Sequence, residues 1–172
     1  MIVIVGESGS GKSTIAKELA KNYGYENVVS YTTRPMRQGE KNHIDYHFVD
    51  DEFFIKNDKN IILKATYRGW KYGTDARDLN DKSVMVLTPS GLRELKSQGI
   101  NFISIYLNVP RRDRLIKLLQ RGDDIEEAYR RSLSDVGQFD GVENEVQYVI
   151  NNPEYKKSVK KLIEEMRERG VI

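Results

Sequence analysis

A glycine-rich run near the start of the chain constrains its fold more than any other feature. Residues 6–13 read Gly-Glu-Ser-Gly-Ser-Gly-Lys-Ser and match the pattern G-x-x-x-x-G-K-[ST]. An apolar, β-branched segment at 2–5 comes directly before the run, and apolar residues at helical spacing, Ile15 and Leu19, follow it. A strand that turns through glycines into a helix is the first unit of a parallel α/β fold.

The same run predicts a phosphate-binding loop. Glycines allow successive backbone N–H groups to turn toward one anion, and the N-terminus of the following helix adds further N–H groups and the positive end of its dipole. Lys12 is expected to bridge the β- and γ-phosphates of ATP, and the Ser13 hydroxyl to bind Mg²⁺. The predicted nucleotide-binding residues are Gly6, Ser8, Gly9, Ser10, Gly11, Lys12, Ser13 and Thr14.

This loop alone does not identify an activity, because GTPase switches, ATP-driven motors, ligases and small-molecule kinases all use it. The alternative interpretation is a glycine-rich turn followed by an ordinary surface lysine. No Asn-Lys-x-Asp run follows the apolar segments at 84–87 or 102–107, which argues against a GTPase switch. Other segments must therefore distinguish between the remaining classes.

Further apolar segments predict a parallel sheet flanked by helices. The segments at 84–87, 102–107 and 146–150 are continuous rather than alternating, as in strands that are buried on both faces. Apolar residues at helical spacing follow Pro110 and extend over 155–166. Because strands and helices alternate, the sequence predicts an α/β fold of the P-loop kinase type.

Two stretches interrupt this alternation. Residues 31–80 combine clustered aromatic residues with polar turns, which indicates a small mixed insert with short strands and a helix from Asp50 or Asp51. Residues 121–140 begin as a polar loop and continue as a charged helix without a strong apolar stripe, which indicates a lid that stands off the core. We therefore expect a single domain with a core of 1–30, 81–120 and 141–172.

Composition argues against several other classes of protein. The chain has 172 residues, and its formal net charge of +2, from 28 Lys plus Arg and 26 Asp plus Glu, does not indicate binding to nucleic acid polymers. Without cysteine it has no disulfide framework and no cysteine-based metal or redox site. Its apolar start is too short for a secretory leader, and no run approaches the roughly 20 residues that span a bilayer. We expect a cytoplasmic protein without membrane contact.

A second group of polar residues predicts a site for another phosphate. Arg34 and Arg37 follow the second expected strand, and Tyr46 and Tyr72 lie in two later segments. Guanidinium forks and phenol hydroxyls both donate hydrogen bonds to phosphate oxygens. Either tyrosine alone would more often be a packing residue. Together the four side chains have the chemistry of a site for a phosphate acceptor.

Four segments of the chain resemble the guanylate kinase family. They are the phosphate loop, S-Y-T-T-R-P-M-R-Q-G-E at 30–40, D-Y-H-F-V at 45–49 and Y-G-T at 72–74. The resemblance extends in order from Met1 to about Asn152. It implies transfer of the γ-phosphoryl group of ATP, with Mg²⁺, to GMP, giving ADP and GDP. It also implies that residues 31–80 bind the monophosphate.

The resemblance implies roles for single residues. The phosphate of GMP would be held by Arg34, Arg37, Tyr46 and Tyr72. The guanine would contact Ser30 and Thr74, and Glu40 would be an acidic residue of the same site. His43 and His47 are expected to be structural or exposed, because phosphoryl transfer relies on positioning and charge neutralisation.

Two arginines of the predicted lid would reach the ATP phosphates. Arg121 matches the first of them and would act in catalysis with Lys12 and Arg34. Counting back from the segment at 149–152 matches Arg131 with the second. Counting forward from Arg121 leaves the match one residue off, so Arg130 is the alternative. Both positions could also belong to an ordinary solvated helix.

Three positions depart from the family pattern. Leu63 lies where the family has a guanine-reading glutamate, and Val86 and Thr88 lie where it usually has two aspartates, one of which would support Mg²⁺. A carboxylate that faces guanine would contribute about 1.5–3 kcal/mol to binding. Either a nearby residue reads guanine, or the acceptor is another phosphate ester, such as a deoxynucleotide or a ribose bisphosphate. A non-catalytic domain that binds phosphopeptides is a third alternative, against which the intact Lys12 and Ser13 argue.

Overall fold

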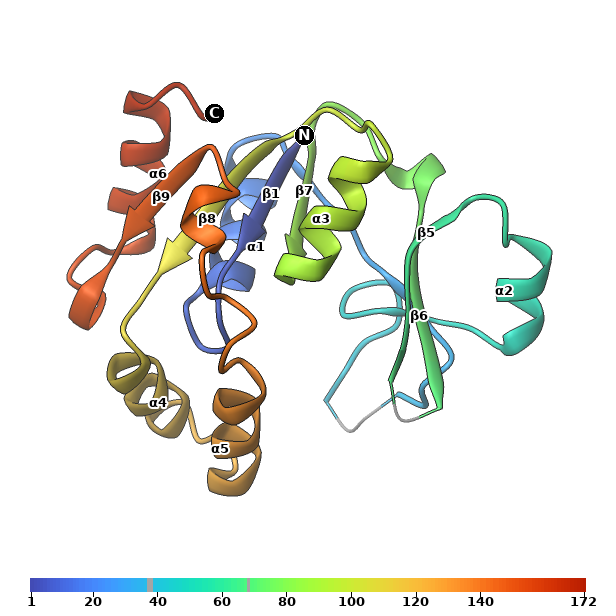
Figure 1. Ribbon diagram of the computed structural model, residues 1–172, viewed down its shortest axis with the longest axis horizontal. Coiled ribbons are helices and arrows are strands. Elements are labelled where there is room, and N and C mark those ends of the chain that lie inside the picture. The colour runs from blue at the N-terminus through green and yellow to red at the C-terminus, as the bar shows by residue number, and fades with distance from the viewer. Residues whose placement is uncertain (37–38, 68) are drawn as a thin grey trace.

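Five parallel strands form the larger of two sheets in the computed structural model, which describes residues 1–36, 39–67 and 69–172. Their order is β2-β7-β1-β8-β9, so the first strand of the chain is central (Figure 1). The predicted parallel sheet is thus confirmed. The strands are β1 (Ile2–Val5), β2 (Glu26–Asn27), β7 (Ser83–Leu87), β8 (Ile103–Asn108) and β9 (Tyr148–Asn151).

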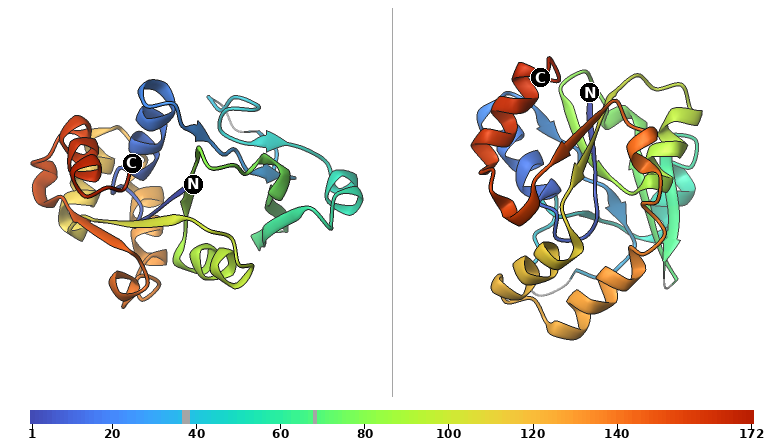
Figure 2. Two further views of the ribbon diagram at one scale, coloured as in Figure 1. Left: turned by 90° about the horizontal axis from the view of Figure 1, so that it is seen from above. Right: turned by 60° about the vertical axis from the view of Figure 1, so that its left-hand side comes forward.

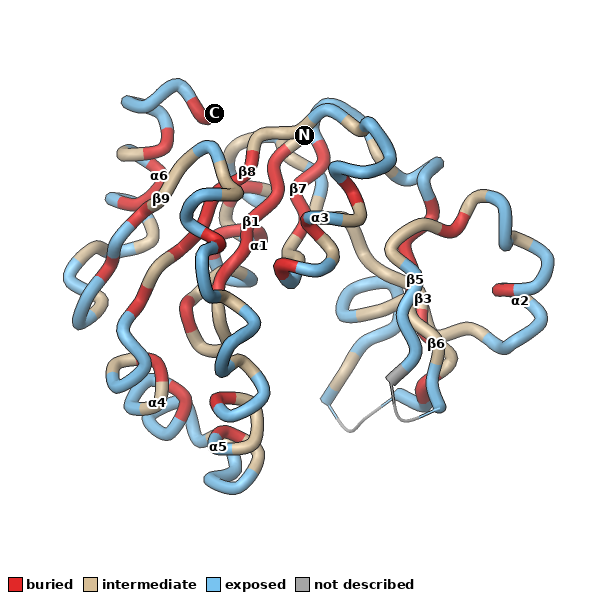
Figure 3. Tube along the Cα trace, viewed as in Figure 1, coloured by how far each residue is buried: buried red, intermediate tan, exposed pale blue. Residues whose placement is uncertain are grey.

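β1 is buried on both faces because its side chains alternate between two apolar clusters. Ile2 and Ile4 pack in one cluster with residues of α1 (Lys12–Asn22) and α6 (Val159–Glu168). Val3 and Val5 pack in the other with Leu92 and Leu95 of α3 (Pro89–Ser97). The tube in Figure 3 is correspondingly red along β1. The loop that follows β1 therefore starts from the best-packed part of the molecule.

A second, four-stranded sheet stands beside the first, as the two views in Figure 2 show. Its order is β4-β3-β6-β5, with β3 and β4 parallel and the other pairs antiparallel. The helix α2 (Asp51–Lys56) begins as expected, because the Asp50 carboxylate accepts a hydrogen bond from the Phe53 N–H at 2.9 Å. The strands are β3 (Tyr31–Thr32), β4 (His47–Phe48), β5 (Ile61–Tyr67) and β6 (Trp70–Asp75).

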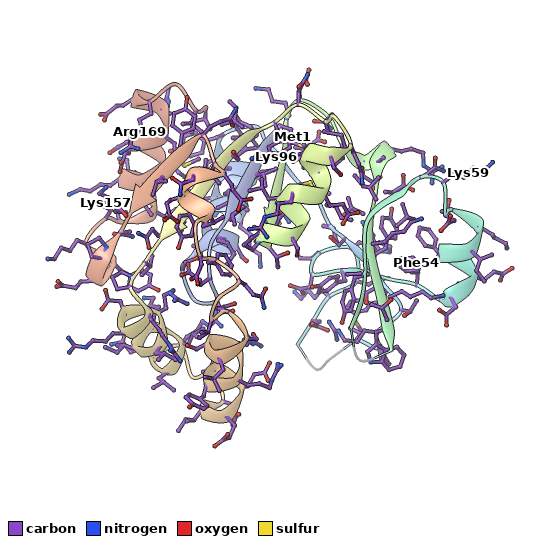
Figure 4. The ribbon with its side chains drawn as sticks, viewed as in Figure 1. Met1, Phe54, Lys59, Lys96, Lys157 and Arg169 are labelled. Carbon is purple, nitrogen blue, oxygen red and sulfur yellow. The ribbon has the colours of Figure 1, made fainter. Side chains whose placement is uncertain are left out.

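Aromatic rings pack against the smaller sheet. Tyr31 stacks between His47 and Phe53, with ring centroids 4.4 Å and 4.6 Å away. Phe54 points from α2 toward β5 and β6 (Figure 4), and a Cβ on Gly73 would lie 3.2 Å from its ring. The absence of a side chain at Gly73 therefore lets the aromatic ring lie close to the strand.

Two further helices, α4 (Arg111–Gln120) and α5 (Ile125–Ser134), follow β8 and lie beyond its carboxyl end (Figure 1). In α5 the side chains of Ala128 and Ser132 are buried. The expectation that this helix lacks an apolar stripe is wrong. Ile125, Tyr129 and Leu133 recur at four-residue spacing, but on an exposed face. The stripe therefore does not pack against the core.

The end of the chain differs from its predicted helix over 155–166. Tyr155 belongs to a separate 3₁₀ turn, η3 (Pro153–Tyr155), and α6 begins only after Ser158, whose hydroxyl caps it. The other 3₁₀ turns are η1 (Ala76–Asp78) and η2 (Val142–Asn144). Within the part of the chain that the structure describes, no helix has the length and apolar character needed to cross a bilayer.

Candidate active site

The phosphate loop joins β1 to α1, and its glycines are required by geometry. Gly9 and Gly11 have φ angles of 83° and 101°, in the left-handed region that side chains disfavour. A Cβ on Gly6 would lie 2.8 Å from the carbonyl oxygen of Leu107, closer than a carbon atom can approach. Since each of these glycines permits a turn or a close approach, the loop has the conformation that its sequence pattern predicts.

Lys12 folds back over this loop. Its Nζ donates a hydrogen bond to the carbonyl oxygen of Glu7 at 2.8 Å. Burial lowers the pKa of Lys12 to about 8, while the carboxylates of Asp135 and Glu7 act in the opposite direction. An incoming phosphate would raise this pKa again and would replace the carbonyl as the partner of the ammonium.

A pocket of about 380 Å³ opens beside the loop. The first turn of α1 forms one wall, and Ser13 and Thr14 are exposed there. Lys117 and Arg121 also line the pocket and bring positive charge to it. Tyr155 also lines the pocket, and its hydroxyl donates to the carbonyl oxygen of Gly9 at 2.5 Å. The pocket thus combines loop amides, a hydroxyl group and cations, the groups that a nucleotide polyphosphate requires.

Two further residues of the predicted loop, Ser8 and Ser10, differ in their contacts. The hydroxyl of Ser10 is buried and has no hydrogen-bond partner among the described residues. The N–H of Ser8 donates to a carboxylate oxygen of Asp135 at 2.7 Å. Sequence reasoning missed Asp135, because nothing in the local pattern around it indicates a contact with a loop at the other end of the chain.

The predicted lid arginines are held by two carboxylates. Asp123 accepts hydrogen bonds from Arg121, with Nε at 2.6 Å, and also lies 3.7 Å from Nη1 of Arg131. Glu127 accepts from Nε of Arg131 at 2.9 Å and from Nε of Arg130 at 2.8 Å. Asp123 thus lies between Arg121 and Arg131 and contacts both.

The predicted acceptor residues converge on the smaller sheet. Arg34 is buried and forms two hydrogen bonds with Glu40, at 2.8 Å and 3.0 Å. Hydrogen bonding to Glu40 raises the pKa of Arg34 despite the opposing effect of burial, and a hydrogen bond with Tyr72 adds to it. The Arg34 guanidinium carbon lies 5.5 Å from the centres of the Tyr46 and Phe48 rings. Arg34, Glu40, Tyr46 and Tyr72 thus form one cluster.

The two residues predicted to contact a base also meet. The hydroxyl oxygens of Ser30 and Thr74 are 3.2 Å apart. The pairing of β3 with β6 determines this contact, because Tyr31 lies opposite Gly73. Ser30 comes directly before Tyr31, and Thr74 comes directly after Gly73. Arg37, the other predicted phosphate ligand, lies outside the described residues.

Comparison with known proteins identifies the family. The sequence model of guanylate kinase matches residues 1–169. The chain belongs to the guanylate kinase family. A guanylate kinase from Prochlorococcus marinus subsp. pastoris is 31% identical over 95% of this chain and 94% of its own length. One from Schizosaccharomyces pombe is 34% identical over 77% of this chain and 71% of its own length. Guanylate kinases are nucleoside monophosphate kinases, and their reaction is an ATP-dependent phosphoryl transfer.

Solved structures support the same fold. A guanylate kinase from Anaplasma phagocytophilum has a TM-score of 0.67 and 24% identity, covering 100% of this chain and 86% of that protein. A shikimate kinase from Bacteroides thetaiotaomicron has a TM-score of 0.55 and 14% identity, covering 99% of this chain and 98% of that protein. The predicted P-loop kinase fold is therefore confirmed.

Two residues that depart from the guanylate kinase pattern have structural roles in this chain. Leu63 has a φ of 53° at an irregularity in β5 and packs against the apolar cluster that contains Leu92 and Leu95. Thr88 follows the carboxyl end of β7 and caps α3, since its hydroxyl accepts from the N–H of Gly91 at 3.2 Å. Neither side chain brings a carboxylate to the junction of the two sheets.

Proposed function

We propose that this member of the guanylate kinase family transfers the γ-phosphoryl group of ATP to GMP, releasing ADP and GDP. The observation that carries the proposal is the pairing of two anion sites on two different sheets. One is the phosphate loop with its adjoining pocket, and the other is the cluster around Arg34. A kinase that transfers a phosphoryl group between two phosphorylated substrates needs two such sites, whereas a simple ATPase needs one.

The donor site would be the phosphate loop. Backbone N–H groups of residues 9–14 would surround the β-phosphate, and the Lys12 ammonium would bridge the β- and γ-phosphates. Arg121 and Arg131 would balance the charge that develops on the transferring group. Support comes from the position of Arg121 on the pocket wall and from its link to Arg131 through Asp123.

The residues present fit a magnesium ion. Mg²⁺ keeps most of its ligands as water and substrate phosphate, so one or two protein oxygens are sufficient. Ser13 is exposed in the pocket, and its hydroxyl has no hydrogen-bond partner among the described residues, so it would be free to bind the ion. When bound there, Mg²⁺ would neutralise phosphate charge and orient the β- and γ-phosphates.

The acceptor site would be the cluster on the smaller sheet. Arg34 and the hydroxyls of Tyr46 and Tyr72 would donate to the phosphate of GMP, and Arg37 would be a further ligand. Glu40 would hold Arg34 in place through its two hydrogen bonds. The paired hydroxyls of Ser30 and Thr74 would face the guanine.

Residues 31–80 would act as a monophosphate-binding insert, and 121–140 as a lid. Both would have to close on their substrates, because an open site would transfer the phosphoryl group to water. The position of α5 outside the core, with Arg131 on it, is compatible with such a motion. We expect this reaction in the cytoplasm, with ATP and GMP as the partners and no nucleic acid polymer.

An assay that couples ADP formation to a spectroscopic signal would test the proposal. The chain would be given MgATP with GMP, dGMP, AMP, UMP, CMP and dTMP in turn. Rapid ADP formation with GMP is expected, together with little ADP when no acceptor is present. Activity with another acceptor but none with GMP would reject GMP as the substrate, while the assignment as a kinase would stand. Absence of activity with every acceptor would reject the reaction.

A further inference from the structure

Three charged side chains that do not line the nucleotide pocket form a cluster around the first turn of the phosphate loop. Glu7 belongs to the loop itself, Arg114 to α4, and Asp135 follows the last residue of α5. Their side chains are 13%, 7% and 14% exposed, so the cluster is largely removed from water. Its residues come from three parts of the chain, and none belongs to the predicted site.

Arg114 binds four groups around this turn. Its Nε donates to the carbonyl oxygen of Val109 at 2.9 Å, and Nη1 donates to the carbonyl oxygen of Ser8 at 3.3 Å. Its Nη2 donates to Oε1 of Glu7 at 3.3 Å, and Nη1 lies 3.6 Å from Oδ2 of Asp135. A guanidinium has five donors in a rigid plane, which a lysine ammonium could not replace at four separate acceptors.

Asp135 completes the arrangement from the other side. It accepts the hydrogen bond from the Ser8 N–H at 2.7 Å, so both backbone groups of Ser8 have side-chain partners. A Cβ on Gly9 would lie 3.1 Å from the carbonyl oxygen of Arg114, so α4 also contacts the next residue of the loop directly. The turn is therefore fixed by groups that do not face the nucleotide pocket.

We propose that Arg114 is a positioning residue of the phosphate loop, and that Asp135 joins the same turn to the helix that carries Arg131. This inference rests on the proposed binding of ATP by the loop. A loop whose outward groups are already satisfied can direct its other N–H groups toward phosphate without rearranging. Arg114 also offsets part of the negative charge of the two carboxylates, which would otherwise repel a highly charged nucleotide more strongly.

Replacement of Arg114 by glutamine would test this role. Calorimetric titration with ATP is expected to show binding about tenfold weaker or worse in Arg114→Gln, the effect of losing a charge-assisted hydrogen bond. Titration with GMP should give the wild-type affinity, because the acceptor cluster lies on the other sheet. Arg114→Lys should remain weak, since lysine keeps the charge but not the planar fork. Arg112→Gln, which removes an exposed charge from the same helix, is the control and should bind ATP normally.

A triple variant distinguishes a positioning role of Arg114 from a role in charge balance. Glu7→Gln, Arg114→Gln and Asp135→Asn together leave no net charge in the cluster and avoid a buried unpaired carboxylate, so this protein should fold even if Arg114→Gln does not. Weak ATP binding by the triple variant is expected. Wild-type ATP binding by it, or by Arg114→Gln, would overturn the positioning role. If the wild-type protein itself bound no ATP, the proposed function would fail instead, whatever the variants did.

Discussion

Arg34 and Glu40 form a paired ionic contact inside the acceptor cluster, with Nη2 2.8 Å from Oε1 and Nη1 3.0 Å from Oε2. Arg34 also donates to the carbonyl oxygen of Pro35 at 2.8 Å, so its guanidinium is fixed before any phosphate arrives. Because the carboxylate neutralises the arginine, the cluster has little net positive charge. It would bind a dianionic phosphate mainly by orienting it and by donating hydrogen bonds to it.

Replacing Arg34 by alanine should impair the use of GMP far more than that of ATP. The variant loses the guanidinium that is proposed to donate to the acceptor phosphate and leaves Glu40 without this partner, so we expect the KM for GMP to rise at least about tenfold. Steady-state kinetics with each substrate varied in turn would measure this. Lys56→Ala, on the exposed face of α2, should leave both constants unchanged. Equal increases in both KM values would contradict the separation of the two sites.

Lys12→Ala should abolish most of the turnover without unfolding the protein. The change removes the ammonium that lies over the loop, and charge stabilisation of this kind contributes about two orders of magnitude or more to kcat. Single-turnover measurements with MgATP and GMP would determine the loss, and circular dichroism would verify the fold. Lys17→Ala, an exposed lysine on the next turn of α1, is the matched control. A turnover near the wild-type value in Lys12→Ala would refute the proposed donor site.

The missing carboxylates predict weak selection for guanine. With Leu63 and Thr88 in place of acidic residues, we expect the preference for GMP over AMP, measured as a ratio of kcat/KM, to be below the roughly ten- to hundredfold that one carboxylate contact supplies. A strong preference in the wild-type protein would show that another residue reads the base.

Thr88→Asp should sharpen this preference at little cost in stability. Aspartate caps helices as well as threonine does, so α3 should keep its start and the free energy of unfolding should change by less than about 1 kcal/mol. Leu63→Glu should instead destabilise the protein, because it places a carboxylate against the apolar cluster under α3. Urea unfolding and acceptor profiles of both variants would test this contrast, which fails if the two proteins lose equal stability.

Ion pairs in the predicted lid should stabilise the folded protein near neutral pH and lose this effect in acid. Hydrogen bonds from Arg130, followed by those from Arg131, lower the pKa of Glu127 from 4.5 to about 2, with burial acting against them. A carboxylate with a lowered pKa stabilises the folded state above its unfolded pKa, and this contribution disappears as the pH falls from about 4.5 toward about 2. Glu127→Gln should therefore be less stable than the wild type at pH 6, and the difference should shrink below pH 4.5. A difference independent of pH in urea unfolding would contradict this assignment.

Local patterns were sufficient to predict the glycine-rich loop after β1 and the parallel sheet around it. The glycine spacing from Gly6 to Gly11 forces one loop geometry, and the continuous apolar runs around it identify buried parallel strands. The cluster around Arg34 was also predicted, from the chemistry of its side chains and from the resemblance to a family. Neither Arg34 nor Tyr72 lies in a pattern that by itself would place them together, since β3 and β6 pair only in the folded sheet.

Features that depend on distant contacts could not be predicted. Arg114 meets Glu7 across 107 positions of sequence, and no periodicity indicates which arginine of a charged helix turns inward. Tyr155 was assigned to the last helix because its spacing from Val159 is helical. The backbone instead turns at Glu154 and Tyr155, which have φ angles of 53° and 52°. A glycine there would have indicated this left-handed conformation in the sequence, whereas glutamate and tyrosine do not.

The central position of β1 also determines when the protein can fold during its synthesis. Ile2 pairs with Val84 on one side and with Ile103 on the other, so β1 is synthesised well before either neighbour and waits for both. Pairing over such separations is slow, because long loops must close before any contact is gained. Until then its apolar segment stays exposed, so nascent chains that end before Asn108 are the ones most prone to aggregate or to recruit a chaperone.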